Sequence, residues 1–288
     1  MITFSVMTFN LRYGTANDGN NVWDNRKDLV IQTLAKYQPT VVGIQEGLNF
    51  QLEYIASKLT DYRQFGISRR GNTEDEYSAI LYDATQVELQ EGGNFWLSET
   101  PNQPGSQSWD SSLPRMVTWA RFRHQNSDRE FYLFNTHFDH RGEIARQKSA
   151  LLVWKRIREI DPNTPLFLTG DFNTVREEIA WNFLVGNASL EGEYGELIDA
   201  WEEAPTRTAS VMTTFHGFHG LEVENRRWQD GRWINGDSHI DWILFRPGVR
   251  VKYATIVTDN RDGRYPSDHY PVYAEFEFIA PIDVQIDC

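Results

Sequence analysis

Short apolar runs, rich in β-branched and aromatic residues and bounded by polar ones, recur along the chain. Runs of this kind, roughly four to eight residues long, are typical of buried β-strands. They predict strands at residues 4–10, 41–45, 78–82, 118–123, 131–136, 166–169, 240–245 and 271–278. Within residues 87–123 the pattern also favours antiparallel hairpins.

Apolar residues at helical spacing occur between several of these runs. Residues 25–37 place apolar side chains on one face and stop before Pro39, and residues 48–59 repeat the spacing. The longest predicted helix covers residues 143–160, before Pro162. Its expected buried face consists of Ala150, Val153, Ile157 and Ile160.

Strands and helices are mixed along the chain without strict alternation. This order favours two packed sheets covered by helices over a Rossmann arrangement, so we predict an α/β (α+β) fold. Because no Pro/Gly/Ser-rich linker divides the sequence, we predict a single domain over residues 1–288. Three long polar loops, 68–76, 99–114 and 215–238, are candidates for a functional rim.

The composition indicates a folded protein of acidic character. Of the 288 residues, 40% are hydrophobic and 14% aromatic, enough for a sizeable core. The 28 basic and 41 acidic residues leave a formal net charge of −13, which repels a polyanion at long range. Binding to bulk DNA is therefore disfavoured.

The sequence predicts neither a membrane anchor nor a disulfide. Residues 1–6 run straight into strand-like alternation, without a basic flank or a small-residue cleavage site, and no apolar stretch approaches the length that spans a bilayer. We expect a cytoplasmic protein, although a secreted protein whose signal peptide had been removed would have the same sequence. The sole cysteine, Cys288, excludes an intramolecular disulfide and is interpreted as incidental.

Polar side chains of catalytic type lie at the ends of several predicted strands. A rigid sheet can aim such side chains from distant sequence positions into one cleft. They occur in the segments Phe9-Asn10-Leu11-Arg12, Gln45-Glu46, Asn135-Thr136-His137, Gly170-Asp171-Phe172-Asn173, His239-Ile240-Asp241 and Ser267-Asp268-His269.

Each segment taken alone also has a purely structural interpretation. Glu46 could cap the following helix, and Asp171 with Asn173 could form an Asx turn. A lone histidine is more often structural than catalytic, and Asp241 could simply pair with an arginine. The functional interpretation therefore depends on the whole set.

Taken together, the same residues supply what metal-dependent hydrolysis of a phosphate ester requires. Oxygen donors such as Glu46 and Asn10 suit Mg²⁺, with Mn²⁺ as an alternative. Zinc fits less well, because closely spaced His and Cys residues are lacking.

The remaining polar residues suit the orientation of an attacking water and the binding of a phosphoryl group. An Asp near an Asn, as in Asp171 and Asn173, can orient an attacking water while the amide donates to the phosphoryl group. A His–Asp couple such as His269 with Asp241 can hold the imidazole in one tautomer and stabilise its protonated form.

These ordered motifs resemble the endonuclease/exonuclease/phosphatase superfamily, which includes DNase I and the nocturnin-type enzymes. The resemblance continues through His239-Ile240-Asp241-Trp242-Ile243-Leu244 and Ser267-Asp268-His269-Tyr270-Pro271-Val272, so it covers nearly the whole chain. It implies a four-layer sandwich of two mixed β-sheets flanked by helices, with the active site at one edge of the paired sheets. It also implies a divalent-metal-dependent phosphoesterase.

The resemblance implies metal-binding roles for three of the residues. Glu46 would be the main metal ligand, with Asn10 beside it. Asp268 would lie close to the metal or to its bound waters.

The resemblance likewise implies catalytic roles for five residues. Asp171 would orient or deprotonate the nucleophilic water, and Asn173 would stabilise the transition state. His269, paired with Asp241, would contact the scissile phosphate or act as a base. His137 would bind the phosphate or protonate the leaving oxygen, and the division of labour between the two histidines stays open.

Three further positions refine the resemblance. Arg115 is similar to a phosphate-contacting arginine of DNase-like members, although it could be a surface arginine. Glu76 resembles an acid that partners the first histidine in some members, although a solvated acidic loop is an equal alternative. Arg12 stands where abasic-site nucleases usually have an acidic or amide residue, which makes DNA repair a less favoured function.

The expected substrate is a phosphodiester in a nucleotide or nucleic acid, with an RNA or DNA end fitting the net charge better than a long duplex. The loop 215–238 could stack on a base and pair with a phosphate, or simply pack on the sheet edge. A phosphomonoesterase acting on inositol-phosphate-like or other small substrates, and a non-catalytic binding protein, are the alternatives. The sequence predicts no membrane or protein partner.

Overall fold

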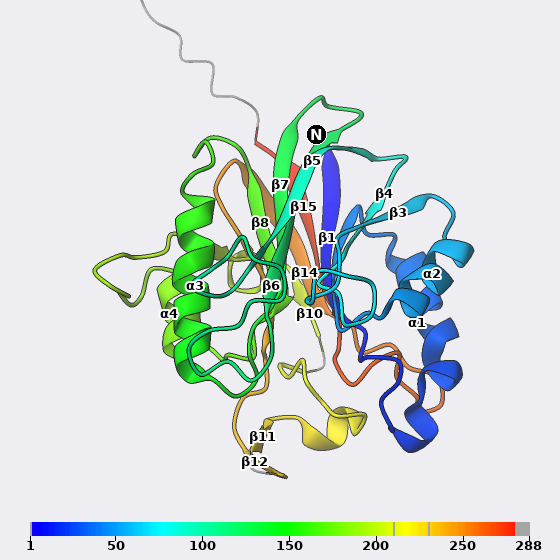
Figure 1. The fold of residues 1–288 in the computed structure, drawn as a ribbon. Helices are drawn as coiled ribbons and strands as arrows, with labels where there is room; N and C mark the ends of the chain where they lie inside the picture. Colours follow the sequence, from blue (N-terminus) through cyan, green and yellow to red (C-terminus); the bar gives the residue numbers. More distant parts are fainter. Residues whose placement is uncertain (1, 210, 230, 280–288) are drawn as a thin grey trace, which may run out of the picture.

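The computed structural model describes residues 2–209, 211–229 and 231–279. Two β-sheets pack face to face, and helices cover their outer faces (Figure 1). A separate two-stranded hairpin projects from one end of the sheets. The predicted four-layer α/β sandwich is therefore confirmed.

The larger sheet has seven strands in the order β10-β14-β15-β1-β2-β4-β3. β1 pairs in parallel with β2 and antiparallel with β15, so the sheet is mixed. Its strands are β1 (Thr3–Asn10), β2 (Val41–Gln45), β3 (Tyr62–Phe65), β4 (Ile80–Asp83), β10 (Arg207–Thr208), β14 (Val249–Ile256) and β15 (Val272–Phe278).

The smaller sheet has six strands in the order β5-β6-β7-β8-β13-β9. β5 and β6 form the antiparallel pair predicted within residues 87–123, and β7 runs parallel to β8. Its strands are β5 (Val87–Trp96), β6 (Met116–His124), β7 (Glu130–His137), β8 (Leu166–Asp171), β9 (Ile198–Asp199) and β13 (Asp241–Phe245).

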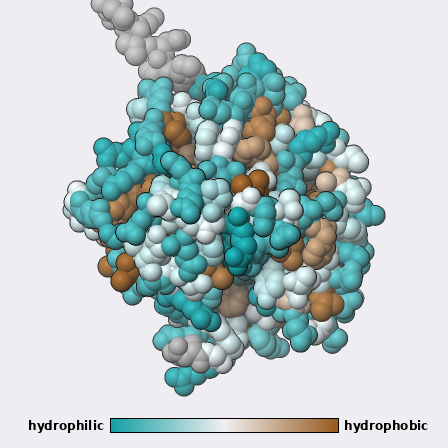
Figure 2. Space-filling view, in the orientation of Figure 1, coloured by the Kyte–Doolittle hydropathy of each residue, from teal (hydrophilic) through white to brown (hydrophobic). Residues whose placement is uncertain are grey.

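Apolar side chains fill the space between the layers, while the visible outer face is mostly hydrophilic (Figure 2). Phe4 of the larger sheet packs against Phe131 and Phe167 of the smaller one. Burial of such aromatic side chains drives the two sheets together.

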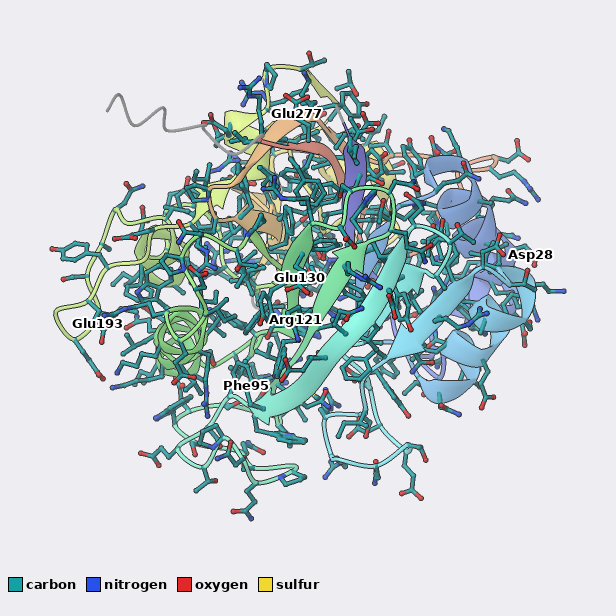
Figure 3. All side chains as sticks on the ribbon, turned by 90° about the horizontal axis from the view of Figure 1, so that it is seen from above. Asp28, Phe95, Arg121, Glu130, Glu193 and Glu277 are labelled. Atoms are coloured by element: carbon teal, nitrogen blue, oxygen red, sulfur yellow. The ribbon has the colours of Figure 1, made fainter. Side chains whose placement is uncertain are left out.

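Helices shield the outer face of each sheet. α1 (Trp23–Tyr37) and α2 (Asn49–Lys58) share a core with β1 and β2, whereas α3 (Glu143–Ile157) and α4 (Ile179–Leu184) share one with β7 and β8. Asp28 of α1 and Glu193, which follows α4, accordingly lie on opposite sides of the sheets (Figure 3). The short helices are α5 (Ala200–Glu203) and the 3₁₀ turns η1 (Gly19–Asn21) and η2 (Gly220–Val223).

A buried polar contact joins the two sheets near the ends of β2 and β7. Asn135 of β7 donates from Nδ2 to the carbonyls of Ile44 and Ala79, at 2.8 and 2.9 Å, and its Oδ1 accepts from Gln45 at 2.7 Å. A Cβ on Gly43 would lie 2.4 Å from Asn135 Oδ1, so glycine is required for this approach. Asn135 thus fixes the register of one sheet against the other.

The predicted strands are confirmed, with shifts of one or two residues at most ends. One such shift is at residues 78–82, where β4 begins only at Ile80. The carbonyl of Ala79 is already bound by the Ile44 N–H and by Asn135, outside the regular ladder.

Two predictions about helices and loops were wrong. The helix expected at residues 143–160 ends at Ile157 and has 15 residues, the same length as α1, so it is not the longest. The chain tightens there, because Ile160 N–H bonds to the carbonyl of Ile157, three residues back. The loop 215–238 contains η2 and the hairpin of β11 (Arg226–Gln229) and β12 (Arg232–Asn235).

None of the helices within the described residues is long and apolar enough to cross a bilayer. Cys288 lies outside the described part of the chain.

Candidate active site

Strand register brings three predicted residues together in the smaller sheet. His137, at the end of β7, is the register partner of Asp171, at the end of β8. Asp171 is in turn opposite Asp241, which begins the antiparallel strand β13. The hydrogen-bonding pattern alone therefore places the three side chains at one end of that sheet.

The larger sheet contributes the others at the same end. Asn10 is opposite Gln45, the residue before Glu46, at the ends of the parallel strands β1 and β2. Asp268 and His269 precede β15, which is antiparallel to β1 and so starts where β1 finishes. This end of the sandwich lies at the bottom of Figure 1.

Glu46 is held by groups from the end of β1. Asn10 Nδ2 donates to Oε1 at 3.0 Å, and the Tyr13 N–H donates to Oε2 at 3.1 Å. Glu46 has a left-handed backbone, with φ of 59°, which is costly for a non-glycine residue and common at functional sites. Burial alone would raise the pKa of Glu46, but His269 and Arg12 outweigh burial and lower it. Glu46 is therefore an anion suited to a cation.

Asn10 connects Glu46 with the smaller sheet. Its Nδ2 also donates to Asp171 Oδ2 at 3.0 Å, while its Oδ1 accepts from the Arg12 N–H at 2.9 Å. The amide thus turns its hydrogens toward both carboxylates and has its oxygen engaged. This arrangement fits a role in orienting the carboxylates better than the predicted role of metal ligand.

Asp171 lies between the two histidines. Its Oδ2 is 3.4 Å from His137 Nε2 and 3.8 Å from His269 Nε2. Its Oδ1 accepts from the Asn173 N–H at 3.0 Å, which is the Asx turn considered as the structural alternative. Burial and the Asp241 carboxylate raise the pKa of Asp171, which improves it as a proton acceptor.

Asn173, in the turn after β8, lines a cavity that most of the other predicted site residues also border. Its backbone is left-handed, with φ of 46°, and its Nδ2 donates to the Phe138 carbonyl at 3.1 Å. The amide is therefore held in a fixed orientation beside Asp171.

The histidines differ in their electrostatic surroundings. His269 Nδ1 lies 2.9 Å from Asp241 Oδ2, with both side chains buried. Burial by itself lowers the pKa of His269, but Asp241 and Asp171 outweigh it and raise the pKa to about 10, so the ring is an imidazolium with a hydrogen on each nitrogen. Burial and Arg115 lower the pKa of His137 well below its usual range, so that ring is neutral.

Asp268 borders the cavity on the side of the larger sheet. Its Oδ2 is 3.6 Å from Arg12 Nε, and burial raises the pKa of its carboxyl group. Arg12 is held in turn by Asp18, to which its Nη2 donates at 2.9 Å. The guanidinium of Arg12 is thus a fixed positive charge beside the predicted metal-binding residues.

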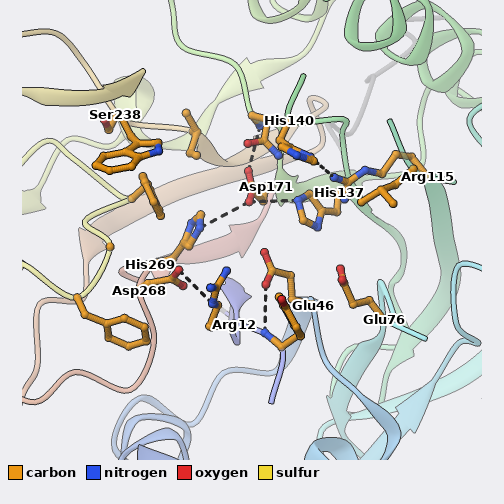
Figure 4. A pocket seen from close by; sticks show the side chains of 18 of the residues that line it. Arg12, Glu46, Glu76, Arg115, His137, His140, Asp171, Ser238, Asp268 and His269 are labelled. Atoms are coloured by element: carbon orange, nitrogen blue, oxygen red, sulfur yellow. Dashed lines mark hydrogen bonds and ion pairs between the residues drawn. The ribbon is translucent and has the colours of Figure 1, made fainter. Parts of the chain in front are cut away.

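Arg115 and Glu76 lie on the opposite side of the cavity (Figure 4). The Arg115 side chain is only 4% exposed and approaches His140 Nδ1 at 3.1 Å. Glu76 accepts from Arg69 at 3.0 Å, a partner other than the histidine that the resemblance implied. Burial and Glu46 raise the pKa of Glu76 to about 7.

Most of these groups border one cavity of about 1030 Å³. Figure 4 shows Glu46, Asp171 and His269 in its middle, with Arg115 on one side and Ser238 on the other. Of the ten predicted site residues, the cavity is lined directly by Glu46, Glu76, Arg115, His137, Asp171, Asn173, Asp268 and His269. Asn10 and Asp241 do not line the cavity, but each holds a lining residue through a hydrogen bond: Asn10 holds Glu46, and Asp241 holds His269.

Among the described residues, two groups of three side chains could hold a cation. In one, Glu46, His137 and Asp171 offer ligand atoms within 4.8 Å of one another. The other consists of Asp171, Asp241 and His269, but His269 already shares a proton with the carboxylates. The first group, with its two carboxylates, fits a hard divalent cation better.

Sequence reasoning had not assigned a site role to Arg12, Arg69 or His140. Arg12 was visible only as a departure from the nuclease pattern, and Arg69 only as positive charge in a rim loop. His140 follows His137 by three residues, and this spacing next to a site histidine is a signal that could have revealed it.

Comparisons with known proteins agree with this geometry. Residues 7–269 match the Endonuclease/Exonuclease/phosphatase family. A family member of known structure from Bacteroides vulgatus is 33% identical, with a TM-score of 0.84, over 97% of this chain and 100% of that one. A mannosyl-6-phosphatase from Bacteroides thetaiotaomicron is 31% identical, with a TM-score of 0.81, over 96% of this chain and 100% of that one.

A more distant similarity is to nocturnin from Drosophila melanogaster, which is 23% identical over 91% of this chain and 43% of its own length. The chain spans about half the length of the curated relatives that it matches. The family match, by contrast, extends over nearly all of the chain and includes every predicted site residue. The chain therefore belongs to the endonuclease/exonuclease/phosphatase family of phosphoesterases.

Proposed function

We propose that this protein hydrolyses the phosphomonoester of a small molecule by attack of a water, with Mg²⁺ or Mn²⁺ as cofactor. The observation that carries the proposal is the convergence of Glu46, Asp171 and the His269–Asp241 pair in one cavity. These groups can hold a cation, accept a proton from water and donate hydrogen bonds to a phosphate.

Two observations favour a small monoester over the nucleic acid expected from sequence. Carboxylates such as Asp75, Glu178 and Asp237 border the cavity, and together with the net charge of −13 they repel a long polyanion. A relative that is 31% identical over nearly its whole length is a mannosyl-6-phosphatase.

The cation would be held by Glu46, with Asp171 and Asp268 close by. When bound, it neutralises charge on the phosphate and makes a water more acidic. Arg115, whose Nε has no hydrogen-bond partner among the described residues, supplies a guanidinium for the dianionic monoester.

The remaining side chains accept the proton of the water and bind the phosphate. Asp171 takes a proton from the attacking water, and Asn173 donates from its amide to a phosphoryl oxygen. His269, kept protonated by Asp241, donates to the phosphate from Nε2. His137 is neutral and contacts the phosphate from the opposite side of Asp171.

A phosphodiester of nucleotide type is the second candidate. Trp228 and Trp233 border the cavity, and exposed indole rings can stack on a base. Arg227 beside them could pair with a second phosphate.

The test compares p-nitrophenyl phosphate with bis-p-nitrophenyl phosphate, in Mg²⁺, in Mn²⁺ and after treatment with EDTA. We expect the monoester to be hydrolysed at least about tenfold faster, activity to disappear with EDTA, and Asp171→Asn to lose about 100-fold or more. Asp61→Asn, at a site remote from the cavity, serves as the control. Undiminished hydrolysis after complete metal removal would overturn the mechanism, and faster diester hydrolysis would favour the second candidate.

A further inference from the structure

The half of the cavity farthest from Arg115 is built by the β11–β12 hairpin. Trp228 and Trp233 are cross-strand partners in this hairpin, with ring centroids 5.3 Å apart. Trp228 is 48% exposed although it is a large apolar side chain, and it borders the cavity. An exposed indole at the mouth of a cavity is a surface on which a ligand ring can pack.

The hairpin is in contact with the catalytic centre through aromatic rings. Trp233 stacks on Phe215 at 5.5 Å, and Phe215 packs against the His269 ring at 4.9 Å. Trp228 is thus linked to His269 through two intervening rings, and both residues border the same cavity. A leaving group that extends along this wall from a phosphate at His269 would approach Trp228.

Charged hydrogen-bonding groups surround the same space. Glu178 Oε1 accepts from Arg227 at 2.8 Å, which fastens the hairpin to the segment before α4. Glu178 Oε2 has no hydrogen-bond partner among the described residues and lies 3.9 Å from Arg146 Nε. Asp237, at the end of the hairpin, accepts from the His239 N–H and also borders the cavity.

Alternating carboxylates and guanidinium groups match hydroxyl groups, because each hydroxyl donates one hydrogen bond and accepts others. We propose that this half of the cavity, formed by Trp228, Glu178 and Asp237 with the flanking arginines, binds a hydroxyl-rich ring, so that the substrate is a sugar phosphate. The inference rests on the proposed function and names the leaving group of the same reaction.

The reaction is balanced without a further reactant. The water oxygen forms a bond to phosphorus, and the bond from phosphorus to the sugar oxygen breaks. Asp171 takes one proton from the water, and the leaving sugar oxygen takes one from the imidazolium of His269, which gives the free sugar and inorganic phosphate. Transfer of the proton from Asp171 to His269, 3.8 Å away, then restores both groups. A polyanionic leaving group is opposed by Glu178 and Asp237, and a plain aromatic one would leave their acceptor positions unused.

The experiment measures kcat/KM with Mg²⁺ for hexose 6-phosphates, nucleoside 5′-monophosphates and phenyl phosphate. In the native protein we expect hexose 6-phosphates to be preferred over both other classes by about tenfold or more. Glu178→Gln and Asp237→Asn should each lower the ratio of hexose phosphate to phenyl phosphate kcat/KM by about tenfold, mainly through KM. Trp228→Ala should raise KM for hexose 6-phosphates and for phenyl phosphate alike.

The matched controls are Glu177→Gln, an exposed neighbour of Glu178, and Tyr194→Ala, an exposed aromatic residue. Neither borders the cavity, and both should behave as the native protein. Glu178→Gln could weaken the bond to Arg227 and so detach the hairpin. Asp237→Asn does not affect that bond and therefore still tests the inference.

The outcomes separate the two proposals. If phenyl phosphate is hydrolysed but hexose phosphates are not preferred, or if nucleotides are preferred, this inference is overturned while the proposed function stands. If no monoester is hydrolysed, the proposed function itself fails. Unchanged substrate ratios in both carboxylate variants would also overturn the assignment of the subsite.

Discussion

At the residue scale, the central feature is the buried pair of His269 and Asp241. One carboxylate at 2.9 Å fixes the ring, and a second, Asp171, lies on its other side at 3.8 Å. Such a pair was predictable as a combination of motifs, because both residues were expected at strand ends, where a packed pair of sheets can bring side chains together. The surroundings of the pair were not predictable from sequence. The position of Arg12 depends on a turn with positive φ, and that of Arg69 on the course of a loop.

The pair gives a prediction about pH. Because Asp241 raises the pKa of His269, the ring stays protonated through neutral pH, and Asp241→Asn should lower that pKa. The protonated form then disappears as pH rises through the lowered pKa, so the variant should lose activity on the alkaline side earlier than the native protein. We expect a loss of about 100-fold or more at neutral pH.

The measurement is the pH profile of kcat/KM for both proteins at a saturating Mg²⁺ concentration. Superimposable profiles would show that Asp241 does not act through His269. The exposed Asp128→Asn substitution should leave the profile unchanged.

At the element scale, register determines the site. His137, Asp171 and Asp241 are adjacent because three strands pair at those positions. The continuous apolar strands were predictable from sequence. β14 was missed although Val249 and Val251 alternate with charged residues, which also indicates a strand with one exposed face. β11 and β12 were missed because these exposed strands bury little apolar surface.

Asn135 gives a prediction about stability. Asn135→Leu would remove three buried hydrogen bonds, to the carbonyls of Ile44 and Ala79 and from the Gln45 amide. Each such bond contributes roughly 1 kcal/mol, so we expect a loss of about 3 kcal/mol in the free energy of unfolding. Urea denaturation checks this, with the exposed Asn126→Leu as control, and a loss no greater than the control's would contradict the linking role.

Asp199 gives a prediction about stability and pH. Burial raises the pKa of this carboxyl group to about 6, although Arg176 partly offsets the effect. The folded-state pKa is above the unfolded one, so the stabilising contribution is present below about pH 4 and is lost as pH rises through 6. The loss is roughly 3 kcal/mol.

Asp199→Asn removes this titration and retains a side-chain oxygen for the Trp201 N–H, which caps α5. The free energy of unfolding of the variant, relative to the native protein, should therefore increase between pH 4 and pH 6.5. Guanidinium denaturation at the two values measures it, and a constant difference would contradict the assignment.

At the scale of the whole molecule, the site is composed of both sheets. Glu46, Asn10, Glu76, Asp268 and His269 come from the strands and loops of the larger sheet. The other site residues come from the smaller one, so the sheets must stay packed for the site to exist. The layered architecture was predictable because ordered motifs and apolar runs agree. The hairpin that shapes the cavity was not predicted, although the sequence Asp230-Gly231 is typical of a hairpin turn, because its flanking residues lack a continuous apolar run.

This dependence predicts one cooperative unfolding transition, as expected for the proposed single domain. Circular dichroism, tryptophan fluorescence and loss of hydrolytic activity should follow the same urea curve. Loss of one signal at a clearly lower urea concentration would indicate that the sheets separate before they unfold.

The most direct test of the central claim is calorimetric titration of the protein with Mn²⁺. If residues from both sheets form one cation site, the native protein should bind Mn²⁺, and Glu46→Gln and Asp171→Asn should each weaken binding by at least about tenfold, whereas the exposed Asp24→Asn should not. Binding that is unchanged in both site variants would contradict the account.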